Sequence, residues 1–294
     1  MADIKKRRYK LLSDFVKVYK YLEDIYDINT LNSCLLPPFF EYAHTHPAFD
    51  HKMTHRFGLW EDKDELVAVV CFEMQLGEAL LSSKKGYEFL LPELLIHAEK
   101  ELSENINGKK SLTVWVIDTE ENKIKLLSDS GYVKIHTEPI TIFSYDNPFM
   151  ETKLPEGFTA ISLDDENDIK KIHECLWKGF NHGDNPDNDF DCRLFMQSGP
   201  NFRNDLTTII KAPNGDYACY AGMCIDHVNQ YAYLEPLATV PEYRKMGLAT
   251  YALTQSMIKT KEEGVKYCFG GAVGFYKAIG FKTISNRQLW RKEF

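Results

Sequence analysis

Residues 231–253 constrain the fold of this chain more than any other segment, because they predict a strand, a tight turn and a helix in direct succession. Residues of alternating bulk run to Val240, and Pro241 then stops the hydrogen-bond ladder of the strand. The turn Arg244-Lys-Met-Gly-Leu-Ala249 leads straight into the helix. Such a turn exposes consecutive backbone N–H groups at the positive end of a helix dipole, which suits a pyrophosphate. The segment therefore predicts an anion cradle at the end of a strand.

The elements around this segment predict an α/β fold with layers of the α+β type, a mixed and mostly antiparallel sheet flanked by helices. Turn signals separate three consecutive strand candidates, which we expect to form an antiparallel meander. A short strand, a helix and a second helical stretch precede the meander, and a helix, a strand, a short helix and a last strand follow it. The expected ranges are 158–163, 164–179, 192–196, 207–211, 217–225, 231–240, 246–263, 265–269 and 275–278, with the last strand after Gly280.

The length of 294 residues predicts about two domains of ~100 to 200 residues each. A run with two prolines and a glycine, residues 144–157, indicates a linker, so we expect domains at 1–147 and 148–294. The first half has a similar but less distinct order of predicted helices and strands. The clearest echo is Leu127-Ser-Asp-Ser-Gly-Tyr132 against Tyr276-Lys-Ala-Ile-Gly-Phe281, each a helix end, a glycine and an aromatic residue that opens a strand. We interpret the chain as an internal duplication of one fold.

Composition excludes several classes of protein. Hydrophobic residues make up 44% and charged residues 27%, as in a folded globular protein, and the net charge of −8 gives no general attraction for nucleic acid. The longest apolar run, residues 66–72, is far shorter than the roughly 20 residues of a membrane span, and the N-terminus lacks the apolar core of a signal peptide, so we expect a cytoplasmic protein. Seven cysteines form no CxxC pair. The basic run at residues 5–10 is interpreted as the solvated face of a first helix or, alternatively, a patch for an anionic ligand.

With these residues in place, the chain resembles the GNAT superfamily of acetyl-CoA-dependent N-acyltransferases. Arg244, Gly247 and Ala249 meet the family motif Gln/Arg-x-x-Gly-x-Gly/Ala, and a phosphate can approach the backbone closely where side chains are small. The preceding Leu237-Ala-Thr-Val-Pro-Glu-Tyr243 and the later Gly274-Phe-Tyr-Lys-Ala-Ile-Gly-Phe281 are similar to the family as well. The resemblance implies two tandem GNAT folds.

The resemblance also implies a site for acetyl-CoA as co-substrate in the second half, with no metal. Backbone groups of a strand end would pair with the pantetheine arm, and the following loop would hold the pyrophosphate. The matching positions are Leu237, Ala238, Thr239, Arg244, Lys245, Met246, Gly247, Leu248, Ala249 and Thr250. The chain departs from the family at Phe269-Gly-Gly-Ala-Val-Gly274, where many relatives carry an Asn and an Ala, so we expect one side-chain contact to the pantetheine arm to be missing.

Two residues are candidates for proton transfer. Tyr276 matches the tyrosine that in many relatives protonates the departing thiolate, while the alternative is a core aromatic on a short helix. Glu235 lies two residues before Leu237 on the same strand, so strand alternation places both on one face, where a carboxylate could take the proton of the attacking ammonium. The alternative for Glu235 is a strand-edge carboxylate paired with a cation.

Two further regions are candidates for binding. The acidic loop Phe180-Asn-His-Gly-Asp-Asn-Pro-Asp-Asn-Asp-Phe-Asp191 would attract a cationic amine through Asp184 and Asp187, or it is a solvated loop. The histidines His44, His46, His51 and His55 are expected to make ordinary polar contacts, although a metal site is the alternative reading.

In the first half, the position of the phosphate turn falls in residues 80–91, which hold one glycine and bulky or charged neighbours. We therefore predict a degenerate copy that binds no acetyl-CoA. The predicted activity is direct acetyl transfer to a primary amine of a small molecule in a ternary complex, with no nucleic-acid or membrane partner. The alternatives are a non-catalytic acyl-CoA sensor, a protein N-terminal or lysine acetyltransferase, and a longer acyl donor. No pattern in the sequence indicates an oligomeric state.

Overall fold

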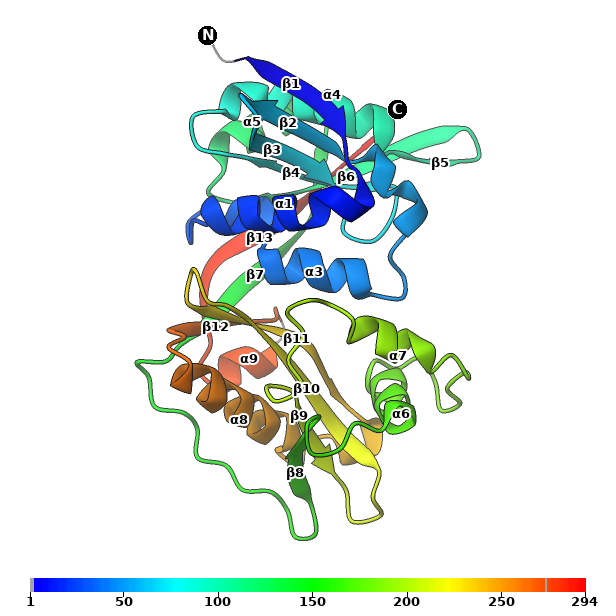
Figure 1. The fold of residues 1–294 in the computed structure, drawn as a ribbon, viewed down its shortest axis with the longest axis vertical. Coiled ribbons are helices and arrows are strands. Elements are labelled where there is room, and N and C mark those ends of the chain that lie inside the picture. Colours follow the sequence, from blue (N-terminus) through cyan, green and yellow to red (C-terminus); the bar gives the residue numbers. More distant parts are fainter. Residues whose placement is uncertain (1–2, 273) are drawn as a thin grey trace. The chain divides into compact units, whose positions relative to one another are not determined.

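The computed structural model describes residues 3–272 and 274–294. The chain forms two compact units (Figure 1). Unit 1 comprises Met1–His44, Ala48–Ile140 and Thr283–Phe294, and unit 2 comprises Thr45–Pro47 and Thr141–Lys282. The division expected from the sequence was 1–147 and 148–294. The last strand of the chain pairs with a strand of unit 1.

Unit 1 contains a sheet in the order β1-β2-β3-β4-β6-β13, with the short β5 beside β6. Its neighbouring strands pair antiparallel except for β4 and β6, which pair parallel. The strands are β1 (Ile4–Arg8), β2 (Gly58–Asp62), β3 (Glu65–Cys71), β4 (Glu78–Ser83), β5 (Glu104–Ile106), β6 (Lys109–Ile117) and β13 (Lys282–Glu293). The helices are α1 (Leu11–Asp24), α2 (Leu31–Cys34), α3 (Pro37–Thr45), α4 (Leu91–Glu101) and α5 (Glu121–Asp129), with short 3-10 helices at His51–Arg56 and Glu88–Leu90.

In unit 2 the strands follow the order β7-β12-β11-β10-β9-β8. Of the strand pairs described in this unit, only β11 and β12 are parallel, and β7 (Val133–Ser144) contributes its last residues from Thr141 onward. The other strands are β8 (Thr159–Ser162), β9 (Thr208–Lys211), β10 (Tyr217–Asp226), β11 (Tyr231–Thr239) and β12 (Tyr267–Gly270). The helices are α6 (Ile169–Gly179), α7 (Asp191–Met196), α8 (Leu248–Glu262) and α9 (Gly274–Ala278), with a 3-10 helix at Pro241–Tyr243. The predicted mixed, mostly antiparallel sheet with flanking helices is confirmed.

Helices cover both faces of the sheet in unit 2, with α8 and α9 on one side and α6 and α7 on the other (Figure 1). The α8 face carries an apolar core, in which Leu248, Ala252, Leu253 and Met257 pack against strand residues such as Met223. These helix positions repeat at the three- and four-residue spacing of one helix face. The core therefore fixes the start of α8 against the end of β11, the place where the sequence predicts the anion cradle.

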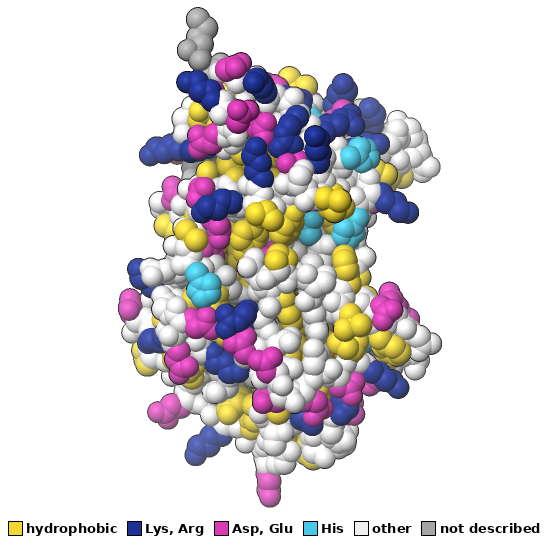
Figure 2. All heavy atoms as spheres, viewed as in Figure 1, with side chains coloured by type: hydrophobic (Ala, Val, Ile, Leu, Met, Phe, Trp, Pro, Cys, Tyr) yellow, Lys and Arg dark blue, Asp and Glu magenta, His cyan; other side chains and the backbone are white. Residues whose placement is uncertain are grey.

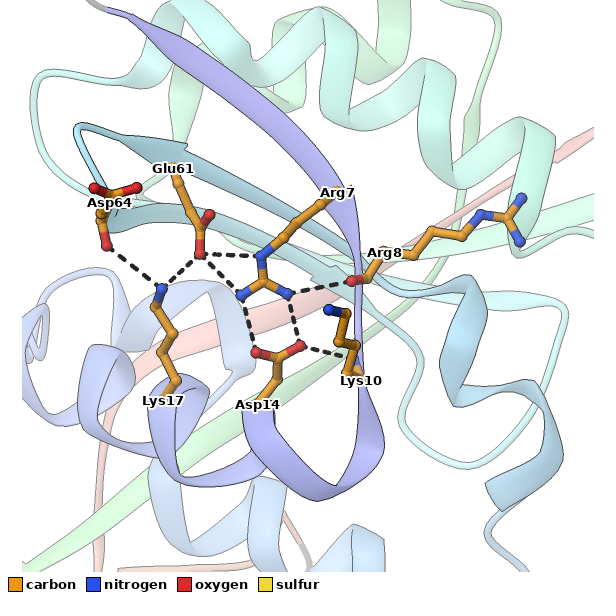
Figure 3. A network of polar contacts seen from close by, with 7 residues as sticks. All are labelled: Arg7, Arg8, Lys10, Asp14, Lys17, Glu61 and Asp64. Atoms are coloured by element: carbon orange, nitrogen blue, oxygen red, sulfur yellow. Dashed lines mark hydrogen bonds and ion pairs between the residues drawn. The ribbon is translucent and has the colours of Figure 1, made fainter.

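The basic run at residues 5–10 is not on a helix, so that expectation was wrong. Ile4–Arg8 is strand β1, paired with β2, and α1 begins only at Leu11. Arg7 donates to Asp14 at 2.7 Å and to Glu61 at 2.8 Å, and Lys17 lies 2.5 Å from the same Glu61 oxygen (Figure 3). Hydrogen bonds from Arg7 hold the pKa of the Glu61 carboxyl below its usual range. These long-range ion pairs favour the strand, and local charge patterning does not reveal them.

The surface seen in Figure 2 carries acidic and basic side chains intermixed over the face in view. Within residues 3–272 and 274–294, no helix has both the length and the apolar character needed to cross a membrane.

All seven cysteines are free thiols.

Candidate functional site

The turn between β11 and α8 has the backbone conformation of an anion cradle. Gly247 stands at the N-cap of α8 with φ 79°, and Lys245 also has a positive φ of 63°. No side chain of the described residues caps this end of the helix, so the first backbone N–H groups of α8 are left for another acceptor. An ideal Cβ on Gly247 would meet nothing within 4 Å, so glycine is needed there for its left-handed φ.

The residues of the turn divide into exposed and buried positions. Arg244, Lys245, Met246 and Gly247 are exposed, whereas Leu248 is 1% exposed and its side chain lies in the core. Of the six positions 245–250 predicted to hold a pyrophosphate, Leu248 can therefore offer only its backbone.

Arg244 braces the turn through three hydrogen bonds. Its guanidinium donates to the carbonyl of Thr239 at 3.1 Å, to the carbonyl of Gly179 at 2.8 Å and to Oδ1 of Asn181 at 2.9 Å. An ideal Cβ on Gly179 would lie 2.8 Å from Cβ of Ala238, so the end of α6 lies against the end of β11. The motif arginine thus ties the cradle to β11 and to α6.

The two parallel strands β11 and β12 separate beside this turn. Their pairs are Tyr231 with Tyr267, Ala232 with Cys268 and Tyr233 with Phe269. β12 ends at Gly270, whereas β11 continues to Thr239. In the part of the chain that the structure describes, Leu237, Ala238 and Thr239 have β10 as their strand partner but no pair with β12. We name this parting of β11 and β12 the unit 2 split.

A β-bulge interrupts β11 at Glu235 and Pro236. Leu234 pairs with Met223 and Leu237 with Ala221, so two residues of β11 stand opposite the single Gly222. A Cβ on Gly222 would lie 2.5 Å from the Glu235 carbonyl oxygen, and only glycine fits there. Because paired residues share a face, Leu234 and Leu237 lie on one face despite their odd spacing. The alternation argument that placed Glu235 on the face of Leu237 therefore does not hold across the bulge.

Tyr276 and Glu235 lie within electrostatic reach of each other. Tyr276 is 9% exposed on α9, and its ring centroid lies 5.3 Å from that of Phe281. Burial raises the pKa of the Tyr276 phenol, and the charge of Glu235 raises it further. A raised pKa keeps the phenol protonated at neutral pH, which is the state a general acid requires. The structure thus brings the two residues proposed for proton transfer into one neighbourhood.

The ring of Tyr276 packs against the backbone of Gly270 and Gly271, a contact that the sequence did not reveal. A Cβ on Gly271 would lie 2.6 Å from Cε2 of Tyr276, and a Cβ on Gly270 would lie 2.7 Å from Cδ1 of the same ring. The Gly-Gly pair that departs from the family pattern therefore admits the aromatic ring against the backbone. Two adjacent glycines at a strand end were the feature of the sequence that could have indicated this close packing.

The acidic loop is only partly available to a substrate. Oδ1 of Asp187 lies 3.2 Å from Nε2 of His173 and accepts from the backbone N–H of Asp189 at 2.9 Å. Asp184 is exposed. Asp187 therefore has a partner within unit 2, whereas Asp184 stands at the surface.

The histidines of residues 44–55 make polar contacts, as expected. Nδ1 of His44 lies 2.8 Å from the Phe40 carbonyl, Nε2 of His51 lies 2.8 Å from the His44 carbonyl, and Nδ1 of His55 lies 2.8 Å from the Lys52 carbonyl. Burial lowers the pKa of His44 to about 4, so its ring is neutral at physiological pH. Across the described residues, no group of three or more His, Cys, Asp or Glu has the arrangement of a metal site.

Unit 1 contains a second strand split with the same chain order. β4, a turn, α4 and the parallel strand β6 follow one another as β11, a turn, α8 and β12 do in unit 2. The pairs of β4 with β6 end at Leu80 and Trp115, while β4 continues to Ser83. We name this parting the unit 1 split.

Side chains of unit 1 fill its split. Lys123 is 3% exposed, and its ammonium donates to the Leu81 carbonyl at 2.7 Å, to Glu120 at 2.8 Å and to the Ser33 hydroxyl. Ser33 belongs to α2, whose four residues all have positive φ and which packs against β4 and β6. The backbone carbonyl that continues β4 beyond its pairs is thus already bound by a lysine of the same chain.

The turn before α4 is occupied as well. The backbone N–H of Gly86 donates to both carboxylate oxygens of Glu88, at 3.0 and 2.9 Å. Pro92 stands in the first turn of α4 and has no N–H to offer. An internal carboxylate therefore takes the place where an anion would bind.

Comparison with known proteins agrees with this geometry. Residues 169–281 match the model of the acetyltransferase (GNAT) family. A search among curated proteins found no match. The matched range contains the unit 2 split, the glycine turn and Tyr276.

Solved structures resemble the chain over nearly its whole length. A GCN5-related N-acetyltransferase from Sphaerobacter thermophilus is 14% identical with a TM-score of 0.64, and the match covers 99% of this chain and 95% of that one. A tandem GNAT protein from the clavulanic acid biosynthesis pathway is 12% identical with a TM-score of 0.64, covering 99% and 98%. The N-myristoyltransferase of Saccharomyces cerevisiae is 14% identical with a TM-score of 0.55, covering 100% and 81%. Identities this low establish the fold. Together with the family match, they identify residues 169–281 as a GNAT acetyltransferase domain, and the chain as an enzyme of the acyltransferase class.

Proposed function

We propose that unit 2 binds acetyl-CoA and transfers its acetyl group directly to a primary amine of a small molecule, without a covalent intermediate in that reaction. The observation that carries the proposal is the unit 2 split. It lies beside the turn at Gly247, where no described side chain caps α8, and the charge of Glu235 acts on the phenol of Tyr276. The GNAT family uses acyl-CoA, and the choice of the acetyl form belongs to the proposal.

In this proposal the backbone of Leu237, Ala238 and Thr239 holds the pantetheine arm, because that stretch of β11 has no pair with β12 in the described residues. The turn and first helical residues, 245–250, hold the pyrophosphate through backbone N–H groups. Arg244 contributes by bracing the turn, since its guanidinium is bonded to Thr239, Gly179 and Asn181.

Glu235 then takes a proton from the attacking ammonium, directly or through water, and the neutral amine nitrogen attacks the acetyl carbonyl. The carbon–sulfur bond breaks as the amide bond forms, and Tyr276 gives its phenolic proton to the departing thiolate. The raised pKa of Tyr276 keeps the phenol protonated at neutral pH, so the proton is present when the thiolate forms.

The acceptor in this proposal is a small cationic amine. The net charge of −8 and the exposed Asp184 favour a positively charged substrate. A cytoplasmic location belongs to the same proposal, and seven free thiols favour a reducing compartment. Unit 1 is proposed to be a degenerate copy that binds no acyl-CoA, because Lys123 and Glu88 occupy its split and its turn.

Calorimetric titration with acetyl-CoA tests the donor site, comparing the wild type with Gly247→Glu. We expect one-to-one binding that the substitution abolishes, because a carboxylate at the cradle repels the pyrophosphate. Gly264→Glu is the matched control: Gly264 follows the other end of α8, has a positive φ and also has open space around its Cβ. Binding of two equivalents, or binding that survives Gly247→Glu, would overturn the assignment of the site.

Thiol release over a panel of small amines then separates an enzyme from a sensor. Tyr276→Phe should keep its affinity for acetyl-CoA and lose turnover by about 10²- to 10⁴-fold, the usual contribution of a general acid. Coenzyme binding without turnover in the wild type would favour a non-catalytic sensor. Myristoyl-CoA is the donor named with the yeast N-myristoyltransferase, and it serves as the second donor in the same assay.

A further inference from the structure

The C-terminal end of α6 is closed by a left-handed asparagine. Phe180 is the C-cap of the helix, and Asn181 follows it with φ 62°. The backbone N–H of Asn181 donates to the Lys178 carbonyl at 3.0 Å. The backbone N–H of His182 donates to the Trp177 carbonyl at 3.0 Å, and the two rings lie 5.4 Å apart. These contacts form a Schellman motif, which fixes how the backbone leaves the helix at Asn181.

The side chain of Asn181 takes part in bracing the glycine turn. Nη2 of Arg244 donates to the Gly179 carbonyl at 2.8 Å and to Oδ1 of Asn181 at 2.9 Å. Because a guanidinium only donates, the amide oxygen of Asn181 faces Arg244, and its amide nitrogen does not. Nε of the same guanidinium donates to the Thr239 carbonyl. The end of α6 thus supplies two of the three acceptors that hold Arg244 beside the turn.

The charge of Arg244 is not cancelled by these contacts. Its acceptors are two backbone carbonyls and one side-chain amide, all of them neutral. Within residues 3–272 and 274–294, Nη1 has no acceptor and no carboxylate forms an ion pair with Arg244. The loop that begins at Asn181 carries four carboxylates, those of Asp184, Asp187, Asp189 and Asp191. The residue of this acidic loop that bonds to the motif arginine is nevertheless an amide.

We propose that Asn181 is a positioning residue for the donor site. Its amide holds the Arg244 guanidinium beside the glycine turn and leaves the positive charge available to a bound pyrophosphate. An amide suits this role because it accepts a hydrogen bond without carrying a charge. A carboxylate in its place would pair with the guanidinium and oppose the anion. The inference rests on the acetyl-CoA site proposed for unit 2, and Asn181 acts through Arg244 without touching a reacting atom.

The expected effect is on affinity rather than on the fold. Asn181 is exposed, and its side chain contributes one hydrogen bond to a group at the surface. Without that bond, Arg244 and the turn occupy more conformations in the free protein, and ordering them weakens binding. One hydrogen bond of this kind corresponds to a change of about 3- to 10-fold in a dissociation constant.

Asn181→Gly tests the brace, because glycine keeps the left-handed backbone and removes only the amide. Calorimetry on the full chain should show the Kd for acetyl-CoA raised by about 3- to 10-fold. The midpoint of urea unfolding without ligand should equal that of the wild type. Asn107→Gly is the matched control, since Asn107 is also exposed with a left-handed φ of 54° but lies in unit 1. It should leave the Kd unchanged.

A double-mutant cycle shows whether Asn181 acts through Arg244. Arg244→Met removes the guanidinium that the amide of Asn181 binds. In that background, Asn181→Gly should change the Kd by less than about 1.5-fold, because the interaction is already absent. The same 3- to 10-fold change in both backgrounds would assign the effect to the loop alone and overturn the positioning role.

Asn181→Asp tests the charge, because it keeps an acceptor oxygen for Arg244 and adds a negative charge. We expect the Kd to rise by about threefold or more at low salt. Relative to the wild type, this loss should shrink at about 1 M salt, where charges are screened beyond about 3 Å. The loss in Asn181→Gly should persist there, because it does not arise from a charge. Unchanged or tighter binding by Asn181→Asp would contradict the role assigned to the neutral amide.

The outcomes separate this inference from the proposed function. Wild-type affinity in Asn181→Gly would overturn the positioning role and leave the donor site in place. A lowered urea midpoint in Asn181→Gly, with no weaker binding than the lost stability explains, would make Asn181 a structural residue only. No binding of acetyl-CoA by the wild type would overturn the donor site itself, and the role of Asn181 with it.

Discussion

The two strand splits have the same chain order but different contents. In unit 2, β11 and β12 separate beside a turn whose helix start is uncapped by any described side chain. In unit 1, β4 and β6 separate in the same way, but Lys123 binds the β4 carbonyl and Glu88 binds the turn. The comparison teaches that sheet pairing keeps the fold, while a few side chains decide whether a ligand can enter. Unit 1 has the same chain order of elements around its split, which its own side chains fill.

The largest effect should come from removing the lysine that fills the unit 1 split. Lys123→Met leaves the Glu120 carboxylate and the Leu81 carbonyl buried without their partner, so we expect a loss of about 3 to 5 kcal/mol of unfolding free energy. Lys125→Met on the same helix is the control, because Lys125 is 75% exposed and pairs with Asp129 only at the surface. That control should cost about 0.5 kcal/mol or less. Urea unfolding measures both, and equal stabilities would show that Lys123 does not hold the split closed.

A second substitution tests the packing of the Tyr276 ring in unit 2. Gly271→Ala places a Cβ 2.6 Å from the Tyr276 ring, which must shift, so kcat should fall by about 10²-fold. Affinity for acetyl-CoA should remain, because the cradle at Gly247 is untouched. A Cβ on Gly274 would meet nothing within 4 Å, and Gly274→Ala should keep wild-type activity. Steady-state kinetics and calorimetry decide, and an unchanged kcat in Gly271→Ala would argue against Tyr276 as the acid.

The pH dependence of unit 1 provides a third test. Burial and the charge of Glu78 raise the pKa of Glu73 from 4.5 to about 7. The folded state binds the proton of the Glu73 carboxyl more tightly than the unfolded state does. The stability that this protonation contributes is therefore present below pH 4.5 and is lost as pH rises to about 7.

Glu73→Gln removes this penalty. At about pH 8, the unfolding free energy of Glu73→Gln from urea titration should exceed that of the wild type by on the order of 1 to 2 kcal/mol. At about pH 4 the two proteins should have the same unfolding free energy. Glu65→Gln serves as control, since that carboxylate is 63% exposed. A difference between Glu73→Gln and wild type that does not change with pH would contradict the shifted pKa.

The smallest effect should come from opening the unit 1 turn. Glu88→Ala frees the N–H of Gly86, which is exposed to water, so we expect a change in unfolding free energy below about 0.5 kcal/mol. Acetyl-CoA should still bind at a single site, because Lys123 continues to occupy the split. Appearance of a second site in the titration would mean that Glu88 alone closes unit 1.

The sequence predicted most of the elements of unit 2 within a few residues. The antiparallel meander, the helix after the glycine turn and the short helix at Tyr276 were all read from local periodicity and turn residues. The sequence was wrong about residues 5–10, because Arg7 is held by Asp14 and Glu61, and Glu61 is far away in the chain. It also missed β4, whose residues had been read as part of the phosphate turn of the first half.

The sequence by itself determined the features that depend on neighbouring residues: the strand that stops at Pro241, the left-handed Gly247 and the start of α8. The tertiary structure decided what depends on distant partners. The pairing of β13 with β6 places the chain end in unit 1, the bulge opposite Gly222 breaks the alternation at Glu235, and Ser33 meets Lys123 across 90 residues. The reason is that turn and helix signals act over a few residues, whereas strand partners and buried ion pairs are selected only when the whole core packs.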